Sequence, residues 1–231
     1  MLFLFLGVKN VIFCKKVSFS AMAIERKKRN VILKGRRDID VVDKLLGILV
    51  NQMEKKEIIE KEWKEYYFYA LVVMVEQWIT IASIVMISLV FRNTIPTIVF
   101  LISFFALRKR TGGFHAEKFW QCYIATIITY IFIGFIADEL CNYKYMVYGC
   151  TIVAVILIAS IGTVNHPNMA MNQEELRESK KAARYILALE CITLCVAILL
   201  KVSMIYITYM AVAVILCAIL LCAAKLIKQE V

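Results

Sequence analysis

The run VSMIYITYMAVAVILCAILLCAA, residues 202–224, decides the class of fold. It contains no charged residue. As an α-helix it would extend about 34 Å, which is enough to cross the ~30 Å hydrocarbon core of a bilayer. The run therefore predicts a transmembrane helix in the last part of the chain.

Five further apolar segments precede this run. They lie near residues 67–90, 94–107, 120–137, 145–164 and 185–200. Hydrophobic residues make up 61% of the chain and the mean hydropathy is +0.73, whereas a soluble domain is about 45–50% apolar. A soluble fold of this size could not bury so much apolar surface, and a bilayer removes the need to bury it. The sequence predicts an all-α, polytopic membrane helix bundle with about six transmembrane segments.

The segment 94–107 is short for a membrane span, at about 21 Å as a helix. It can be accommodated in two ways. Either the helix extends past Arg92, whose charged head snorkels to the interface, or the segment is re-entrant. The sequence leaves both structures open.

Lysine and arginine gather in alternate segments between the apolar runs. The segments before the first run, between the second and third, between the fourth and fifth, and after the sixth hold 15, 4, 4 and 2 of them. The intervening loops hold one each, namely Arg92, Lys144 and Lys201. Because cytoplasmic loops carry the excess of Lys and Arg, we expect a bacterial cell-membrane protein with both termini in the cytoplasm. The net charge of +10 then reflects orientation in the lipid bilayer, and we expect no nucleic-acid partner.

Residues 1–37 are predicted to be a basic extension outside the fold, and residues 38–231 to form the membrane domain. The apolar run at the start of the extension is too short to span, so it is either an interfacial segment or the chain truly begins at Met22. From Asp38 the apolar residues recur at helical spacing, as Ile39, Val42, Leu46, Leu49, Val50 and Met53. This period predicts an amphipathic helix on the membrane surface or against the bundle.

Neither a metal site nor a cofactor is expected. The eight cysteines form no CxxC pair and mostly lie within apolar runs, where a thiol behaves as a small hydrophobe. Two histidines are too few for most zinc sites.

The segment RKRTGGFHAEKFWQC, residues 108–122, carries the side chains best suited to chemistry. Gly112 and Gly113 break the helix between the second and third apolar segments, His115 follows, and Cys122 opens the third segment. A cysteine nucleophile needs its thiolate, which a nearby histidine, cations or a helix N-terminus would favour. On one continuous helix the step from His115 to Cys122 rises about 10.5 Å, so a direct pair requires the Gly-Gly turn to fold back.

The same residues also fit a plainer description. Cys122 would then be a cysteine at the membrane edge, His115 a loop residue, and the cations from Arg108 on would serve only the positive-inside rule. A second candidate is Glu76, near the middle of the first apolar segment beside Gln77. An intramembrane carboxylate is a functional suspect by default, although a pair that faces the bundle and bonds its neighbours fits equally well.

The run from Arg108 through Gly113 and His115 to Cys122 resembles the signature of the accessory gene regulator B (AgrB) family of membrane peptide-processing endopeptidases. The resemblance covers the chain from about Asp38 onward. It implies that Cys122 is the nucleophile, that His115 is its catalytic partner and that Arg108 and Gly113 have supporting roles. Glu117 is a further candidate, for orienting His115.

The resemblance also implies an activity. Such an enzyme removes the C-terminal tail of a small quorum-sensing pre-peptide, of the AgrD type, and cyclises the remainder through a cysteine thioester to a thiolactone or lactone. A homodimer is a further assembly to consider. The loop after His166 is acidic where the family carries lysines and prolines, which puts the precursor contacts in doubt. The alternative is a small transporter, exporter or structural bundle subunit without covalent catalysis, with Glu76 in a polar pathway.

Overall fold

The computed structural model describes residues 40–60, 64–112, 119–164 and 173–227. Contacts divide the chain into two units, Met1–Arg37 and Asp38–Val231, and all the described residues belong to the second. The prediction that residues 1–37 lie outside the fold therefore stays a prediction.

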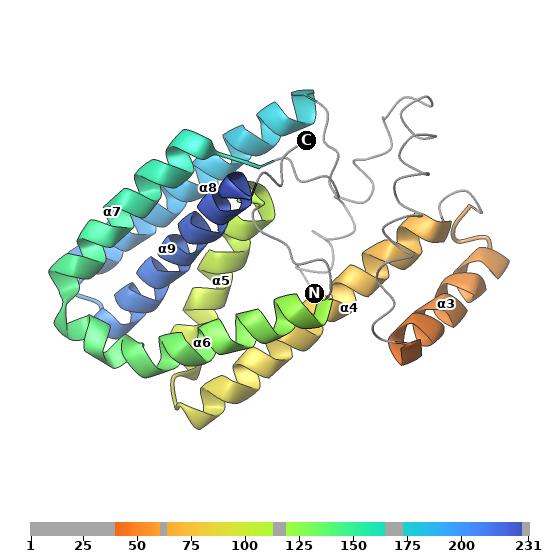
Figure 1. Cartoon of the computed structure of the whole chain (residues 1–231), viewed down its shortest axis with the longest axis horizontal. Coiled ribbons are helices and arrows are strands. Elements are labelled where there is room, and N and C mark those ends of the chain that lie inside the picture. The colour runs from red at the N-terminus through yellow and green to blue at the C-terminus, as the bar shows by residue number, and fades with distance from the viewer. Residues whose placement is uncertain (1–39, 61–63, 113–118, 165–172, 228–231) are drawn as a thin grey trace. The chain divides into compact units, whose positions relative to one another are not determined.

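The described residues form helices joined by short links, with no strand among them, as predicted (Figure 1). In chain order the helices are α3 (Asp40–Lys55), α4 (Lys64–Val90), α5 (Thr94–Thr111), α6 (Phe119–Asn142), α7 (Lys144–Ile161), α8 (Gln173–Leu199) and α9 (Met204–Leu226).

By length and composition, five of these helices can cross a membrane: α4, α6, α7, α8 and α9. The helix α5, which covers the short predicted segment, carries Arg108, Lys109 and Arg110 in its last turn and is not among the five. It begins after Arg92, so it does not extend past that residue as one expectation had it. It lengthens at its other end instead, and at about 27 Å it is one unbroken helix rather than a re-entrant loop.

The amphipathic helix predicted from Asp38 is α3. Its Leu46 and Val50 are buried and the helix packs against α4, while Leu45 and Ile48 are exposed. An ion pair also joins the two helices, because Lys64 Nζ lies 2.6 Å from Glu54 Oε2.

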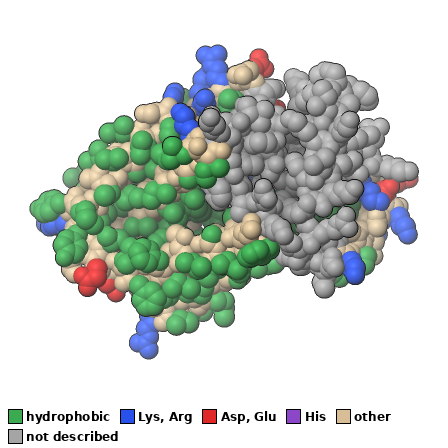
Figure 2. Space-filling model, viewed as in Figure 1, with side chains coloured by type: hydrophobic (Ala, Val, Ile, Leu, Met, Phe, Trp, Pro, Cys, Tyr) green, Lys and Arg blue, Asp and Glu red, His purple; other side chains and the backbone are tan. Residues whose placement is uncertain are grey.

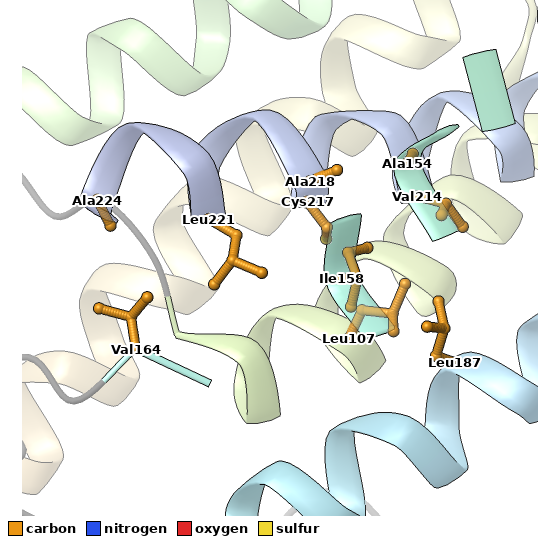
Figure 3. Packing of buried hydrophobic residues seen from close by; sticks show 10 residues of the cluster. All are labelled: Leu107, Ala154, Ile158, Val164, Leu187, Val214, Cys217, Ala218, Leu221 and Ala224. Atoms are coloured by element: carbon orange, nitrogen blue, oxygen red, sulfur yellow. The ribbon is translucent and has the colours of Figure 1, made fainter. Parts of the chain in front are cut away.

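The centre of the bundle is α9, which has the largest buried share of the apolar helices. One buried cluster joins it to α5, α7 and α8 through residues that include Leu107, Ile158, Leu187 and Val214 (Figure 3). A second cluster joins it to α4, α5 and α6 through Ile84, Phe100, Tyr130 and Tyr209. The helix α5 therefore runs beside α9 through both clusters.

Large apolar side chains are exposed along the other helices. They include Met86 on α4, Phe132 on α6, Ile156 on α7 and Leu189 on α8. Hydrophobic side chains cover most of the described face in Figure 2, and charged side chains lie at its margins. Such a surface is suited to lipid rather than water.

Three links between helices are very short. Residues 91–93 join α4 to α5, Tyr143 alone joins α6 to α7, and residues 200–203 join α8 to α9. Arg92 and Lys201 take left-handed backbone angles, with φ of 55° and 52°. Such a residue after a helix ends it sharply, so α4 and α8 stop abruptly and the next helix follows within a few residues.

The helix α8 begins well before its apolar part. The predicted fifth segment starts at residue 185, but the helix starts at Gln173 and includes a polar stretch. Glu174 and Glu175 lie in its first turn, where negative charge interacts favourably with the helix dipole. Much of the predicted polar loop is therefore helical.

Candidate active site at the end of helix α5

The motif segment begins on the last turns of α5 and passes into Gly112. This glycine has φ of +66°, and its N–H donates to the carbonyl of Arg108 over 3.1 Å. A Cβ at this position would lie 3.0 Å from the carbonyl oxygen of Val164. Both the positive φ and the close approach of the Val164 carbonyl favour glycine. The first glycine of the motif therefore ends α5 at the point where the segment that follows α7 lies against it.

Three hydrogen bonds from other segments hold this end of α5. The Thr163 hydroxyl donates to the Arg110 carbonyl over 2.9 Å and the Ser179 hydroxyl donates to it over 3.2 Å. The Val164 N–H donates to the Thr111 carbonyl over 3.1 Å. We call these three bonds the α5 clasp. Because the last carbonyls of a helix have no partner within it, the clasp satisfies groups that would otherwise need water or a cap.

Arg108 lies one turn before the end of α5 and its side chain turns toward that end. Its guanidinium Nη1 donates to the carbonyl of Gly112, which is also within 3.4 Å of the Thr111 hydroxyl. Arg108 also interacts electrostatically with the thiols of Cys217 and Cys122. The cation thus contacts the helix-ending turn and acts on the cysteine of the motif.

Cys122 lies in the first turn of α6 as the structure describes that helix, and it is partly exposed. Its carbonyl accepts a hydrogen bond of 2.8 Å from the Thr126 hydroxyl. The structure brings Arg108 and Cys122 into electrostatic range, while Gly113, His115 and Glu117 lie outside the described residues.

Comparison with known proteins decides the family. The sequence model of the accessory gene regulator B family matches residues 46–222. The chain belongs to this family. Its membership of AgrB, first indicated by the 108–122 motif, is thereby confirmed, and with five apolar helices it is a multi-pass membrane protein of a quorum-sensing family.

Curated relatives agree with the AgrB assignment. AgrB-like protein 2 of Clostridium perfringens strain 13 is 27% identical over 96 residues, which are 42% of this chain and 45% of that protein. The AgrB-like protein of Clostridium perfringens strain SM101 is 27% identical over 99 residues, which are 43% and 46% of the two chains. Each match therefore covers less than half of the relative, whose own name rests on likeness to AgrB. No solved structure matches the chain.

The remaining candidates from the sequence are the carboxylate Glu76, its neighbour Gln77, the cysteines and His166. Glu76 is buried on α4, whereas Gln77 is exposed. The seven cysteines within the described ranges are all free thiols, and those ranges hold no group of three His, Cys, Asp or Glu residues that could bind a metal. His166 lies outside the described residues. Glu76 and Gln77 therefore do not both face inward.

One buried carboxylate was missed. Glu190 lies on α8 with only 8% of its surface exposed, and its Oε2 atom has no hydrogen-bond partner among the described residues. Ser103 of α5 is a hydrogen-bond partner of the carboxyl group, and Glu190 also acts electrostatically on Cys217. The signal was present in the sequence, because Glu190 is the one acidic residue within the predicted segment 185–200.

Proposed function

We propose that this chain is a membrane cysteine endopeptidase that removes the C-terminal tail of a quorum-sensing pre-peptide and cyclises the remainder. Cys122 is the nucleophile and His115 is its partner. The observation that carries the proposal is the match of the AgrB family model to residues 46–222, which contain the whole motif from Arg108 to Cys122.

The proposed reaction has two acyl transfers. The Cys122 thiolate attacks the scissile carbonyl, the peptide C–N bond breaks, and the tail leaves as an amine that takes its proton from His115. A thiol or hydroxyl of the bound peptide then gives its proton to His115 and attacks the thioester. This closes a thiolactone or lactone and releases the Cys122 thiolate. Neither transfer consumes water, and a site at the membrane edge limits competing hydrolysis.

The electrostatics around Cys122 support the first step. In the proposed mechanism Arg108, whose electrostatic interaction reaches Cys122, stabilises the thiolate as a nearby cation does. Gly112 ends α5 between them, which allows the chain to change direction before His115.

We place this site at the cytoplasmic edge of the membrane, with both termini inside. The last turn of α5 carries three adjacent cations, and Lys180, Lys181 and Arg184 lie on the polar start of α8, whose Ser179 bonds to that turn. Lys and Arg gather on the cytoplasmic side of membrane proteins. The charges near the site therefore favour this orientation.

A transporter without covalent chemistry is the rival function. Two carboxylates, Glu76 and Glu190, are buried in helices that can cross the membrane, and intramembrane carboxylates often belong to transport pathways. A transporter would move a peptide without cutting it, so cleavage separates the two functions.

The test is co-expression with a quorum-sensing pre-peptide of the AgrD type that carries an epitope tag at its C-terminus. We expect the wild-type chain to remove the tag and Cys122→Ala to leave the peptide intact at normal membrane abundance. The matched control is Cys150→Ala, because Cys150 is an exposed thiol on α7 that should be dispensable. Loss of the tag with Cys122→Ala would contradict the proposal.

A further inference from the structure

The α5 clasp joins the start of the motif to two segments far away in the sequence. Thr163 and Ser179 are 53 and 69 residues from Arg110, yet both donate to its carbonyl oxygen. Thr163 follows Gly162, which ends α7 with φ of +74°, and Ser179 lies near the start of α8. Two hydroxyls from separate elements thus converge on one backbone oxygen.

The other carbonyls near this end are satisfied locally. The Thr111 hydroxyl donates to the Leu107 carbonyl over 3.1 Å, and the Gly112 N–H donates to the Arg108 carbonyl. The carbonyls of Arg110 and Thr111 instead bond to the clasp. The direction in which α5 ends therefore depends on α7 and α8.

Cys122 lies on a helix to which the clasp makes no hydrogen bond. The helices α5 and α6 share α4 and α9 as packing neighbours, whereas the clasp joins the end of α5 to α8 and to the end of α7. The clasp therefore acts on the end of α5 that carries Arg108. A small rotation of this end would change the separation of Arg108 from Cys122.

We propose that Thr163 and Ser179 are positioning residues of the site, whose hydroxyls hold the end of α5 and with it the Arg108 side chain that bonds to the Gly112 carbonyl. This assignment rests on the proposed endopeptidase function. Neither residue touches the reacting atoms; both act through the Arg110 carbonyl. The third clasp bond is made by the backbone of Val164, whose buried side chain packs in the same cluster as Leu107. That bond remains when the hydroxyls are removed, so we expect the bundle to stay folded.

The test uses the full-length chain with Thr163→Val and Ser179→Ala, singly and combined. A synthetic pre-peptide of the AgrD type that the wild-type chain cleaves is the substrate, and kcat and KM are measured separately. Because a shift of about 1 Å in a catalytic group can cost 10²-fold, we expect kcat of the combined variant to fall about 10- to 100-fold, with KM changed less than about threefold. Restoring only the hydroxyl, as Thr163→Ser with Ser179→Thr, should return kcat to near the wild-type value.

A matched control separates this role from loss of a buried hydroxyl in general. Thr151 is buried on α7 and donates to the Val147 carbonyl within its own helix, so Thr151→Val should leave kcat unchanged. A combined clasp variant that keeps the wild-type kcat would overturn the proposal. If the combined variant does not accumulate in the membrane, the single variants, each of which keeps one hydroxyl on Arg110, decide the question by the same measurement.

A second measurement needs no peptide and so separates failure of the two proposals. Iodoacetamide alkylation of Cys122, followed by mass spectrometry of the full-length chain, reports how reactive the thiol is. If Arg108 is displaced, the thiolate is less favoured and alkylation of the combined variant should slow at least about threefold. A wild-type chain that cleaves no peptide refutes the proposed function, whereas equal alkylation rates refute the positioning role.

Discussion

Arg108 illustrates at the scale of one residue how a charge near a membrane edge can have a specific task. Its guanidinium bonds to the Gly112 carbonyl while it acts electrostatically on Cys122. The planar guanidinium of arginine has several N–H donors and can make both interactions at once, whereas the compact ammonium of lysine cannot. Arg108 is thus distinct from Lys109, which is exposed on the same turn.

We predict that Arg108→Lys lowers peptide processing about 10- to 100-fold, because a hydrogen bond that involves a charged group contributes about 1.5–3 kcal/mol. Release of the C-terminal tag in membranes of equal abundance measures the effect. Lys109→Arg, the reverse exchange on the neighbouring residue, should have no effect. Full activity of Arg108→Lys would show that Arg108 serves only as a positive charge that sets the orientation of the chain in the membrane.

Gly112→Ala is predicted to destabilise the chain. A left-handed backbone costs a residue with a Cβ about 1–2 kcal/mol, and the new methyl would lie 3.0 Å from the Val164 carbonyl oxygen. The midpoint of thermal unfolding in detergent should fall. Gly149→Ala on α7 is the control, since a Cβ there meets nothing within 4 Å; that variant should be at least as stable as the wild type. An unchanged midpoint for Gly112→Ala would show that the turn can relax.

The sequence identified Arg108 and Cys122 as candidates because they stand in a recognisable motif, but it could not identify Thr163 or Ser179. A hydroxyl that bonds to a backbone carbonyl more than 50 residues away leaves no periodic pattern and no spacing to recognise. Glu190 was overlooked for another reason. Both Glu76 and Glu190 are carboxylates within predicted apolar segments, so the rule that such residues are functional suspects identifies Glu190 as readily as Glu76.

At the scale of helices, hydropathy located each apolar helix and misjudged several ends, including those of α5, α6 and α8. The helix α5 continues to Thr111 and α8 begins at Gln173, both beyond the apolar runs that predicted them. Hydropathy reports where a helix is apolar, whereas helical hydrogen bonding continues into charged residues at the membrane boundary. The cations of α5 and the polar start of α8 are such continuations, and the clasp joins them.

The helix α9 gives a prediction about packing. Its buried surface is rich in alanine, including Ala211, Ala213, Ala218 and Ala224, and small residues let neighbouring membrane helices approach closely. Ala218→Leu should therefore overpack the bundle and cost about 1–3 kcal/mol, seen as a lower unfolding midpoint in detergent. Ile219→Leu at the exposed neighbour should change little. If Ala218→Leu is as stable as the wild type, the helices around α9 can shift to accommodate the larger side chain.

At the scale of the whole molecule, the proposed orientation can be tested with a membrane-impermeant maleimide on intact cells. In a background without native cysteines, Lys144→Cys should be labelled from outside. Glu178→Cys should be labelled only after the cells are permeabilised. Both positions are exposed, so the difference reports the side of the membrane. The opposite pattern would move Cys122 to the outer face.

The cyclisation step predicts a covalent intermediate. If the ring-forming Cys or Ser of the peptide is replaced by Ala, cleavage can proceed but ring closure cannot. The truncated peptide should then accumulate on Cys122 as a thioester that hydroxylamine removes, visible in the intact mass of the purified chain. A simple hydrolase would release linear peptide from both substrates at equal rates, without an adduct.

The three short links described above have a consequence for how the chain is made. As the chain leaves the ribosome, the bilayer can receive α4 with α5, α6 with α7 and α8 with α9 as three successive pairs. In the proposed orientation each pair carries one cation across the membrane, Arg92, Lys144 or Lys201, out of 28 in the chain. Moving a charge through hydrocarbon is costly, so the distribution of cations keeps their contribution to the cost of insertion small for each pair.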